Sequence, residues 1–544
     1  MGINVLNNTS SQEIITTAGA NITSGDLIIN AESGFAFAAS NALTIAQNNN
    51  TTAGTSALTA NTNTGSSNFY GGIYYSSSKI RTCQLSNGTL VTGYAGNGTG
   101  SSTNNVNIVF KTLLNGAPVG AISISQSGVY WVLVRALSTG FVVLWANGSS
   151  ELRFAIYNNS GTAILSSTVV SGGVYNASNS ECFDIRVTSN NEIVIAYSIS
   201  SNGLRFKRYN SSGVLQGTET TVEASITGNY IAINPDTSGG FWIYYYREQA
   251  SAAWKFAIYN SSGTLQGALV TVASTGSTLS YGDFDSFTTR LTGGNVVLMG
   301  PTAASGIPNA YVYNSSGTLI TTIDFAGSDT GFAANQSIPG ICLTGTGFTI
   351  FARGSNSPGY FWVYDANGGQ LRGRTQTSFT SWGSGSTSAF YETYSKLFSL
   401  GNAGYVVLNG YYDSGNALNY LTLLCFTSSG TTVGSSTTII NAASTRFGQI
   451  SSVLTSDGSV YYAYISNAGN SQNFYGMYAV QRKSVIGVAQ NTVSANSSVR
   501  IATTGSYTIN SDFFAGGNFD QRTATVPGTK GTVTGTSAVL FGMS

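Results

Sequence analysis

Few residues of this chain could perform chemistry, and the commonest catalytic side chain is missing. None of the 544 residues is histidine, so Ser-His-Asp and Cys-His nucleophile systems, imidazole bases and His-ligated metals are excluded. Glycoside hydrolysis needs only two carboxylates. The best pair is Asp283 and Asp285, which would point to the same face of a strand. Acidic residues beside a turn are more often solvated, so we predict no catalytic site, no metal and no cofactor.

Patterns typical of metal, redox and nucleotide sites are also missing. The four cysteines lie far apart without a paired spacing, whereas a zinc site needs clustered ligands. We interpret them as free thiols buried in strands; they are Cys83, Cys182, Cys342 and Cys425. The glycine pairs at residues 239–240 and 293–294 are not followed by Lys and Ser or Thr, so they do not form a phosphate loop.

The composition excludes several other classes of protein. Charged residues are only 8% of the chain and the net charge is +1, which disfavours a nucleic-acid binder. Hydrophobic residues at 42% and aromatic residues at 12% exclude disorder for most of the length. The most apolar stretch, residues 129–146, is interrupted by Arg135 and Gly140, so two strands explain it better than a membrane span of about 20 residues. The first residues resemble no signal peptide, so we expect the protein either to stay in the cytoplasm or to be assembled there and leave the cell by another route such as lysis.

A turn signature recurs along the chain, in the form Tyr209-Asn210-Ser211-Ser212-Gly213. Similar copies occupy residues 157–161, 259–263 and 313–317, degenerate copies occupy 364–368 and 426–430, and an earlier one lies at 114–116. The better copies are preceded and followed by short apolar stretches, as in residues 256–259 and 264–267. This pattern predicts a β-hairpin at each copy.

A second signature, in which a Leu- or Thr-initiated polar turn leads into an apolar strand, precedes each hairpin. Its eight copies cover residues 85–91, 137–144, 188–194, 237–243, 291–298, 343–348, 400–408 and 454–460. Two hairpins in a repeat of about 50 residues make a four-stranded unit, the unit of a β-propeller blade. We therefore predict an all-β fold with an eight-bladed β-propeller, and neither a β-helix nor a sandwich. The eighth copy lacks a clear second hairpin, and residues 72–75 could supply its outer strand.

The two ends of the chain differ from the repeats. We predict an N-terminal β segment with a Ser/Thr/Asn linker at residues 1–75, the propeller at 76–488 and a small C-terminal β module at 489–544. Within the first segment, the stretches at 26–30 and 34–37 are expected to be short strands, and residues 48–67 form the Thr/Asn/Ser/Gly tract.

Aromatic residues could bind sugars or fill the core. The chain holds 31 Tyr, 27 Phe and 6 Trp, and we expect Trp145 and Trp242 to pack between blades. Tyr245 and Tyr246 are neighbours on a predicted strand and would point to opposite faces, both of which meet other blades. A sialidase-like propeller would use an arginine cluster, to which Arg81, Arg135, Arg153 or Arg186 could contribute, but its Asp-box turn is missing.

The terminal segments resemble known modules. Residues 485–490, 499–505 and 531–542 are similar to small β modules of bacteriophage tail and capsid-decoration proteins, and residues 26–30 resemble the openings of such virion proteins. No catalytic residues come with this resemblance. It implies a virion component, such as a tail fibre, a tail-tube or nozzle protein, or a capsid-attached fibre.

We therefore predict a virion surface structural protein of the fibre or receptor-binding type, which contacts host surface glycans and is not an enzyme. Two alternatives stay open, a decoration protein of the capsid or tail with a purely structural role and a carbohydrate-active enzyme on a propeller scaffold. The expected partners are other virion structural proteins, host surface glycans and further copies of the chain, with no nucleic acid and no membrane insertion.

Overall fold

The computed structural model consists of strands and turns in the part of the chain that it describes. This part comprises residues 4–8, 11–18, 27–30, 35–38, 81–96, 105–111, 118–126, 129, 131–147, 149–174, 182–199, 202–247, 253–273, 288–291, 293–301, 308–324, 340–344, 347–353, 359–376, 394–399, 405–413, 418–426, 432–443, 447–454, 459–466, 472–479, 485–489, 498–502, 505–509 and 531–535.

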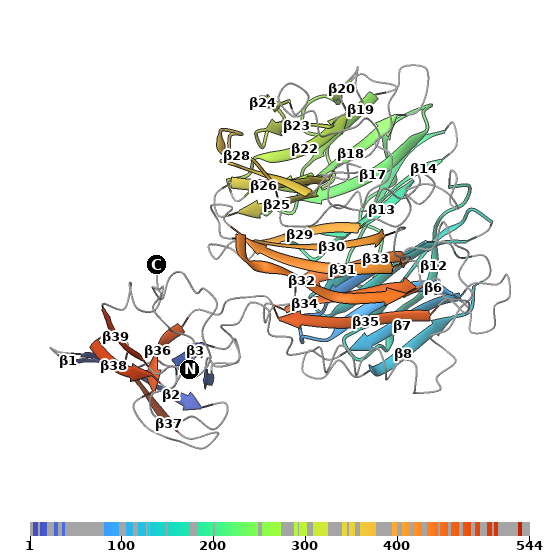
Figure 1. The fold of residues 1–544 in the computed structure, drawn as a ribbon. Coiled ribbons are helices and arrows are strands. Elements are labelled where there is room, and N and C mark those ends of the chain that lie inside the picture. Colours follow the sequence, from blue (N-terminus) through green and yellow to red (C-terminus); the bar gives the residue numbers. More distant parts are fainter. Residues whose placement is uncertain are drawn as a thin grey trace.

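The repeats form successive antiparallel sheets whose strands follow one another along the chain (Figure 1). The first three sheets comprise β5 (Arg81–Gln84), β6 (Leu90–Gly96), β7 (Asn105–Lys111) and β8 (Pro118–Ile124); β9 (Trp131–Leu137), β10 (Gly140–Ala146), β11 (Leu152–Asn158) and β12 (Ala163–Ser171); and β13 (Phe183–Val187), β14 (Ile193–Ile199), β15 (Gly203–Tyr209) and β16 (Thr220–Glu223). The next three comprise β17 (Gly228–Pro235), β18 (Phe241–Arg247), β19 (Ala253–Tyr259) and β20 (Val270–Ala273); β21 (Thr288–Arg290), β22 (Val296–Pro301), β23 (Pro308–Tyr313) and β24 (Leu319–Ile323); and β25 (Gly340–Thr344), β26 (Gly347–Arg353), β27 (Gly359–Tyr364) and β28 (Gln370–Gln376).

The last two repeated sheets comprise β29 (Tyr394–Ser399), β30 (Tyr405–Asp413), β31 (Leu418–Phe426) and β32 (Thr432–Ala443), and then β33 (Phe447–Leu454), β34 (Ser459–Ser466) and β35 (Gln472–Ala479). The last sheet has three strands in the described residues. Each first strand lies beside the first strand of the next sheet. Successive four-stranded antiparallel sheets packed through their inner strands define a propeller architecture, and the predicted all-β repeat fold is confirmed.

The Asn-Ser-Ser-Gly segments form the turns that lead into the fourth strands. Oδ1 of Asn260 accepts hydrogen bonds from the backbone N–H groups of Ser262 (3.0 Å) and Thr264 (2.9 Å). Gly263 has a φ of 78°, a left-handed conformation that costs glycine no Cβ clash. The same pair of bonds recurs at Asn158, Asn210, Asn314 and Asp365. The signature is therefore a local hydrogen-bonding motif, an Asx turn.

The sheets are apolar on both faces because each lies between two neighbours. Tyr245 and Tyr246 are adjacent on β18 and both are buried. Tyr245 packs in a cluster with the preceding sheet, and Tyr246 packs in a cluster with the following one. The prediction that both faces of this strand meet other sheets is confirmed.

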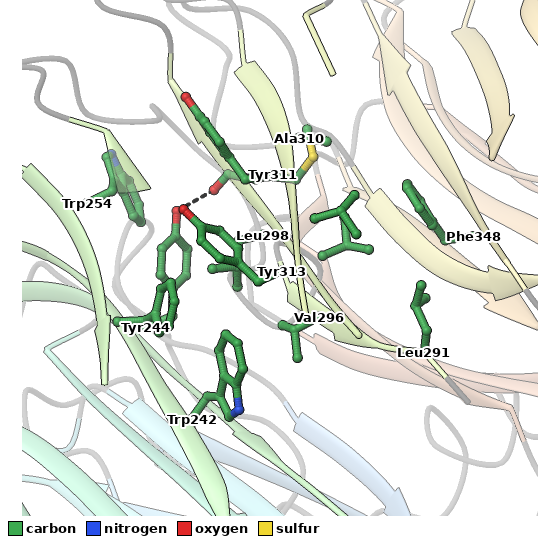
Figure 2. Close-up of a cluster of buried hydrophobic side chains, with 14 of the residues drawn as sticks. Trp242, Tyr244, Trp254, Leu291, Val296, Leu298, Ala310, Tyr311, Tyr313 and Phe348 are labelled. Atoms are coloured by element: carbon green, nitrogen blue, oxygen red, sulfur yellow. Dashed lines mark hydrogen bonds between the residues drawn. The ribbon is translucent and has the colours of Figure 1, made fainter. Parts of the chain in front are cut away.

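The cluster between β18, β19 and the following sheets is rich in aromatic rings. Figure 2 shows Trp242, Tyr244 and Trp254 beside Leu298 and Tyr313. The hydroxyl of Tyr244 donates to the carbonyl oxygen of Met299 in the next sheet at 2.5 Å. A buried tyrosine hydroxyl needs such a partner, and this bond links the two neighbouring sheets.

The first and last repeated sheets lie side by side although they are far apart in sequence. The backbone N–H of Thr82 on β5 donates to Oγ of Ser451 on β33 at 3.0 Å. The hydroxyls of Thr92 on β6 and Tyr461 on β34 share a hydrogen bond of 2.8 Å. All four side chains are buried, so these bonds belong to the packed interior of the repeat array.

Strands from both ends of the chain pair in one further sheet. Its order is β1 (Asn4–Asn8), β2 (Ser11–Ala18), β37 (Ser498–Ala502), β36 (Val485–Ala489), β3 (Leu27–Asn30) and β4 (Phe35–Ala38). β38 (Gly505–Ile509) and β39 (Gly531–Gly535) pair antiparallel in a separate two-stranded sheet (Figure 1). The boundaries at residues 75 and 488 stay predictions, and residues 72–75 lie outside the described part of the chain.

Candidate functional site

The aromatic residues predicted to fill the core do so. Trp145 and Trp242 are buried, with relative exposures of 0% and 1%. The acidic pair Asp283 and Asp285 lies outside the described residues, so its role as a catalytic pair stays untested.

The arginines singled out in the sequence occupy two kinds of position. Arg81, Arg135 and Arg186 lie on β5, β9 and β13, the first strands of three successive sheets. Arg153 lies on β11, where its Nε donates to the carboxylate of Glu151 at 2.9 Å. The fold therefore brings three of the four to the inner strands of the propeller.

Asp184 is the acidic centre of this inner region. Its carboxylate accepts bonds from the backbone N–H groups of Ile185 and of Ile233, each at 2.8 Å. Nε of Arg186 donates to the same carboxylate at 3.2 Å, and a guanidinium nitrogen of Arg135 lies 3.5 Å away. Nε of Arg135 also donates to the carbonyl oxygen of Ile185 at 3.0 Å. One buried carboxylate thus joins β9, β13 and β17, the inner strands of three sheets.

Glu219, just before β16, is the centre of a second ionic cluster. Its carboxylate accepts hydrogen bonds from the hydroxyl of Tyr197 and from Nη1 of Arg205. Nζ of Lys207 lies 3.4 Å from the same carboxylate and donates to the carbonyl oxygen of Val170 on β12 at 2.6 Å. The cluster therefore connects the third sheet to the preceding one.

Glu223, at the end of β16, repeats this chemistry one sheet further on. Its carboxylate accepts from the hydroxyl of Tyr245 at 2.5 Å, from Nζ of Lys255 at 2.6 Å and from Nη1 of Arg247 at 3.0 Å. The acceptor belongs to the third sheet and all three donors belong to the fourth. This cluster is therefore an ionic link between neighbouring sheets.

Protonation states in the two clusters follow from burial and charge. Burial, and then the hydrogen bond to the neighbouring glutamate, raises the pKa of Tyr197 and of Tyr245 far above the ordinary value of a phenol. Burial acts to raise the pKa of Glu219 and Glu223, but hydrogen bonds from tyrosine and from the cations outweigh it and hold each pKa below its usual value. Each tyrosine is thus a neutral donor and each glutamate an ionised acceptor, an arrangement that disfavours a phenolate nucleophile.

Two of the cysteines behave as predicted for structural thiols. Cys83 on β5 and Cys182, directly before β13, are buried and do not form a disulfide. Burial raises the pKa of the Cys83 thiol to about 12, so it is protonated at neutral pH and unreactive. Cys342 and Cys425 lie on β25 and β31.

The described residues offer neither a metal-binding cluster nor a membrane-spanning helix. Among the residues with described positions, no group of three or more cysteine, aspartate or glutamate side chains could hold a metal ion. In the same part of the chain, no helix has the length and apolar character that a membrane crossing requires.

The sequence patterns did not reveal the glutamate clusters. Glu219 and Glu223 lie after a hairpin turn, where acidic residues are usually solvated. Only the strand register and the contact between sheets bring Tyr197 and Tyr245 to them.

No protein-family profile matches the chain, and no curated protein sequence matches it significantly. Among solved structures it is similar to the Dos1 propeller, with 9% identity, 76% of this chain and 94% of that chain covered, and a TM-score of 0.46. It is also similar to the BP39L lectin from Burkholderia pseudomallei, with 12% identity, coverage of 68% and 100%, and a TM-score of 0.45. A polysaccharide lyase of family PL25, an ulvan lyase, shows 9% identity, coverage of 75% and 96%, and a TM-score of 0.40. The order and pairing of the strands, rather than these likenesses, define this chain as an all-β repeat protein of propeller architecture.

Proposed function

We propose that this chain is a virion surface structural protein of the fibre or receptor-binding type, which displays a propeller and contacts host surface glycans. It does so without catalysis or a cofactor, and its other partners are structural proteins of the same virion. The likeness of its terminal segments to phage β modules supports this assignment. The observation that carries it is the sheet in which β1–β4 pair with β36 and β37. A unit built from both chain ends can attach the protein while the repeated sheets extend away from it (Figure 1).

We further propose that the repeated sheets close into an eight-bladed ring. The bonds between Thr82 and Ser451 and between Thr92 and Tyr461 support closure, because they join the first sheet to the last. Inner strands are also joined by Asn234, whose amide donates to the hydroxyl of Thr288 at 2.8 Å. A closed ring leaves no exposed sheet face at either end of the array.

A designed disulfide tests ring closure. The hydroxyl oxygens of Thr82 and Ser451 are 3.1 Å apart, so sulfur atoms in their places would need only a small adjustment to form a disulfide. The double variant Thr82→Cys, Ser451→Cys is expected to form this cross-link on mild oxidation, with the joined peptides identified by mass spectrometry. The single variant Thr82→Cys is the control and should give no such peptide. Failure of the double variant to cross-link while folded would contradict closure.

Cryo-electron microscopy of the native particle that carries this chain tests the virion assignment. We expect the terminal sheet at the attachment point and the repeated sheets outward. A chain found only free of particles would overturn the assignment, and the carbohydrate-active enzyme would then have to be tested with polysaccharide substrates.

Glycan contact is tested separately, by binding of the purified full chain to an array of host surface glycans. Retention that free glycan competes away is the expected result. No retention, combined with a place on the particle, would favour the purely structural decoration protein. One observation already favours that alternative, since large aliphatic side chains stay exposed on the outer strands.

A further inference from the structure

The last repeated sheet ends at an open edge in the described part of the chain. Seven repeated sheets have four strands each, whereas this sheet consists of β33, β34 and β35. In an antiparallel pair, alternate residues direct their N–H and C=O groups away from the partner strand, so one side of β35 carries backbone groups that β34 does not pair. β35 is eight residues long and contains no charged residue and no proline. Proteins usually cover or protect such an edge, so we expect another strand beside it.

The chain that leaves β35 cannot provide this strand. Only residues 480–484 separate β35 from β36, and β36 pairs with β3 and β37 in the terminal sheet. In the other repeated sheets at least four residues separate the third strand from the fourth, and the shortest such turn is residues 159–162 between β11 and β12. The residues after β35 are therefore enough for a turn but not for a turn and a strand.

The order of the strands indicates which segment takes this place. Each of the seven fourth strands is followed directly by the first strand of the next sheet, as β8 is by β9. The sheet beside the last one is the first, since β5 contacts β33 and the backbone N–H of Thr82 donates to Oγ of Ser451. The same order therefore assigns the missing fourth strand to the segment that directly precedes β5.

The connections in the other sheets show where this strand should end. As few as three residues, after β32, and as many as 17 residues, after β28, separate a fourth strand from the next first strand. Counted back from Arg81, where β5 begins, these lengths place the end of the strand between residues 63 and 77. In this window the one apolar stretch among Ser, Thr, Asn and Gly is residues 69–75, with the sequence Phe-Tyr-Gly-Gly-Ile-Tyr-Tyr. Isoleucine and tyrosine favour strands.

We propose that residues 69–75 form the fourth strand of the last repeated sheet, by pairing antiparallel with the open edge of β35 in the same chain. Every other fourth strand pairs antiparallel with its third strand. The proposal rests on the eight-bladed ring proposed above, because the first sheet follows the last only in a ring. It explains why the eighth copy of the repeat lacks a second hairpin. It also connects the ring to the terminal sheet twice, through the chain after β4 and through residues 480–484.

Hydrogen exchange of the purified full chain, measured residue by residue by mass spectrometry, tests whether the edge is paired. Amides on both sides of β35 are expected to exchange at least about tenfold more slowly than those of an unstructured peptide. β32 ends its sheet in the described residues, so its alternate amides are the internal comparison for an unpaired edge. Exchange of alternate β35 amides as fast as that of the β32 edge overturns the proposal.

Photo-cross-linking identifies the strand that occupies the edge. Photoreactive benzoylphenylalanine in place of Tyr74 keeps an aromatic side chain and is expected to join the peptide of residues 472–479, in a product of monomer mass. The same amino acid in place of Leu58, outside the apolar stretch, is the control and should not reach this peptide. Cross-links from position 74 only to other parts of the chain overturn the proposal. A product of dimer mass also overturns it, because a second copy would then supply the strand.

The double variant Thr82→Cys, Ser451→Cys separates this proposal from the ring on which it rests. If its disulfide forms while alternate β35 amides exchange rapidly, the ring stands and the strand assignment fails. If the disulfide does not form in the folded protein and the β35 edge is open, the ring and the strand assignment fail together.

Discussion

The Asx turn offers the sharpest test of how the repeat signature builds the fold. In Asn260→Ala the side-chain oxygen that holds the turn is removed. The backbone N–H groups of Ser262 and Thr264 then lose an acceptor at 3.0 and 2.9 Å, and the hydroxyl of Ser262 loses one at 2.8 Å. Each such bond contributes about 0.5 to 1.5 kcal/mol, and the turn is exposed, so we expect a local loss of about 1 to 2 kcal/mol.

Hydrogen exchange measured by mass spectrometry detects this loss of local stability at the backbone amides of the turn. About 1 to 2 kcal/mol corresponds to exchange faster by about 5- to 30-fold at these amides. The matched control is Asn260→Asp, because an aspartate oxygen accepts the equivalent pair of backbone hydrogen bonds at Asp365 and Asp236. If Asn260→Ala exchanged like the wild type, or if the aspartate variant exchanged as fast as the alanine variant, the turn would not depend on this oxygen and the reasoning would be refuted.

Three further predictions concern the ionic cluster, a thiol and the contact between the first two sheets. Glu223→Gln should lower stability by about 2 kcal/mol at pH 7. The pKa of Glu223 in the folded protein is held below its ordinary 4.5, so its contribution to the free energy of unfolding is complete above pH 4.5 and is lost as the pH falls through the folded pKa. The free energies of unfolding of variant and wild type should therefore converge in acid. A difference that stays constant with pH would contradict the ion-pair role. The thiol of Cys83, with its pKa raised to about 12, should resist a thiol reagent at pH 8 until the protein unfolds, and rapid labelling of the native protein would be the contrary result. Gly93→Ala should lower the free energy of unfolding by about 1 to 3 kcal/mol, because the added Cβ would lie 2.2 Å from a side-chain carbon of Val134 on β9. Combining it with Val134→Ala should restore part of this stability. Thermal unfolding of the single and double variants measures the restoration.

The repeat architecture was predictable because its signals are local. An Asx turn is made within five residues, from Asn260 to Thr264, so the same letters recur wherever the same turn is needed. Alternation along β18 likewise predicted that Tyr245 and Tyr246 lie on opposite faces, each against another sheet. Composition and periodicity were sufficient for the strand content and for the burial of Trp145.

The ionic clusters were not predictable because their members meet only across strands and sheets. Glu223 reaches the hydroxyl of Tyr245, 22 residues away, through the contact between two sheets. Asp184 joins inner strands of three sheets through partners up to 49 residues away. No spacing rule connects such positions, since their distance depends on how the sheets pack.

The strands, the turns and the apolar faces follow from local patterns of residues, because each depends on neighbours a few residues apart. Which charges meet, which aliphatic side chains stay exposed and which ends pair depend on the tertiary structure. β2 and β37 are adjacent in one sheet although they lie at opposite ends of the chain, and Thr82 lies beside Ser451. Such contacts depend on the packing of the whole repeat array, and no local pattern of residues encodes them.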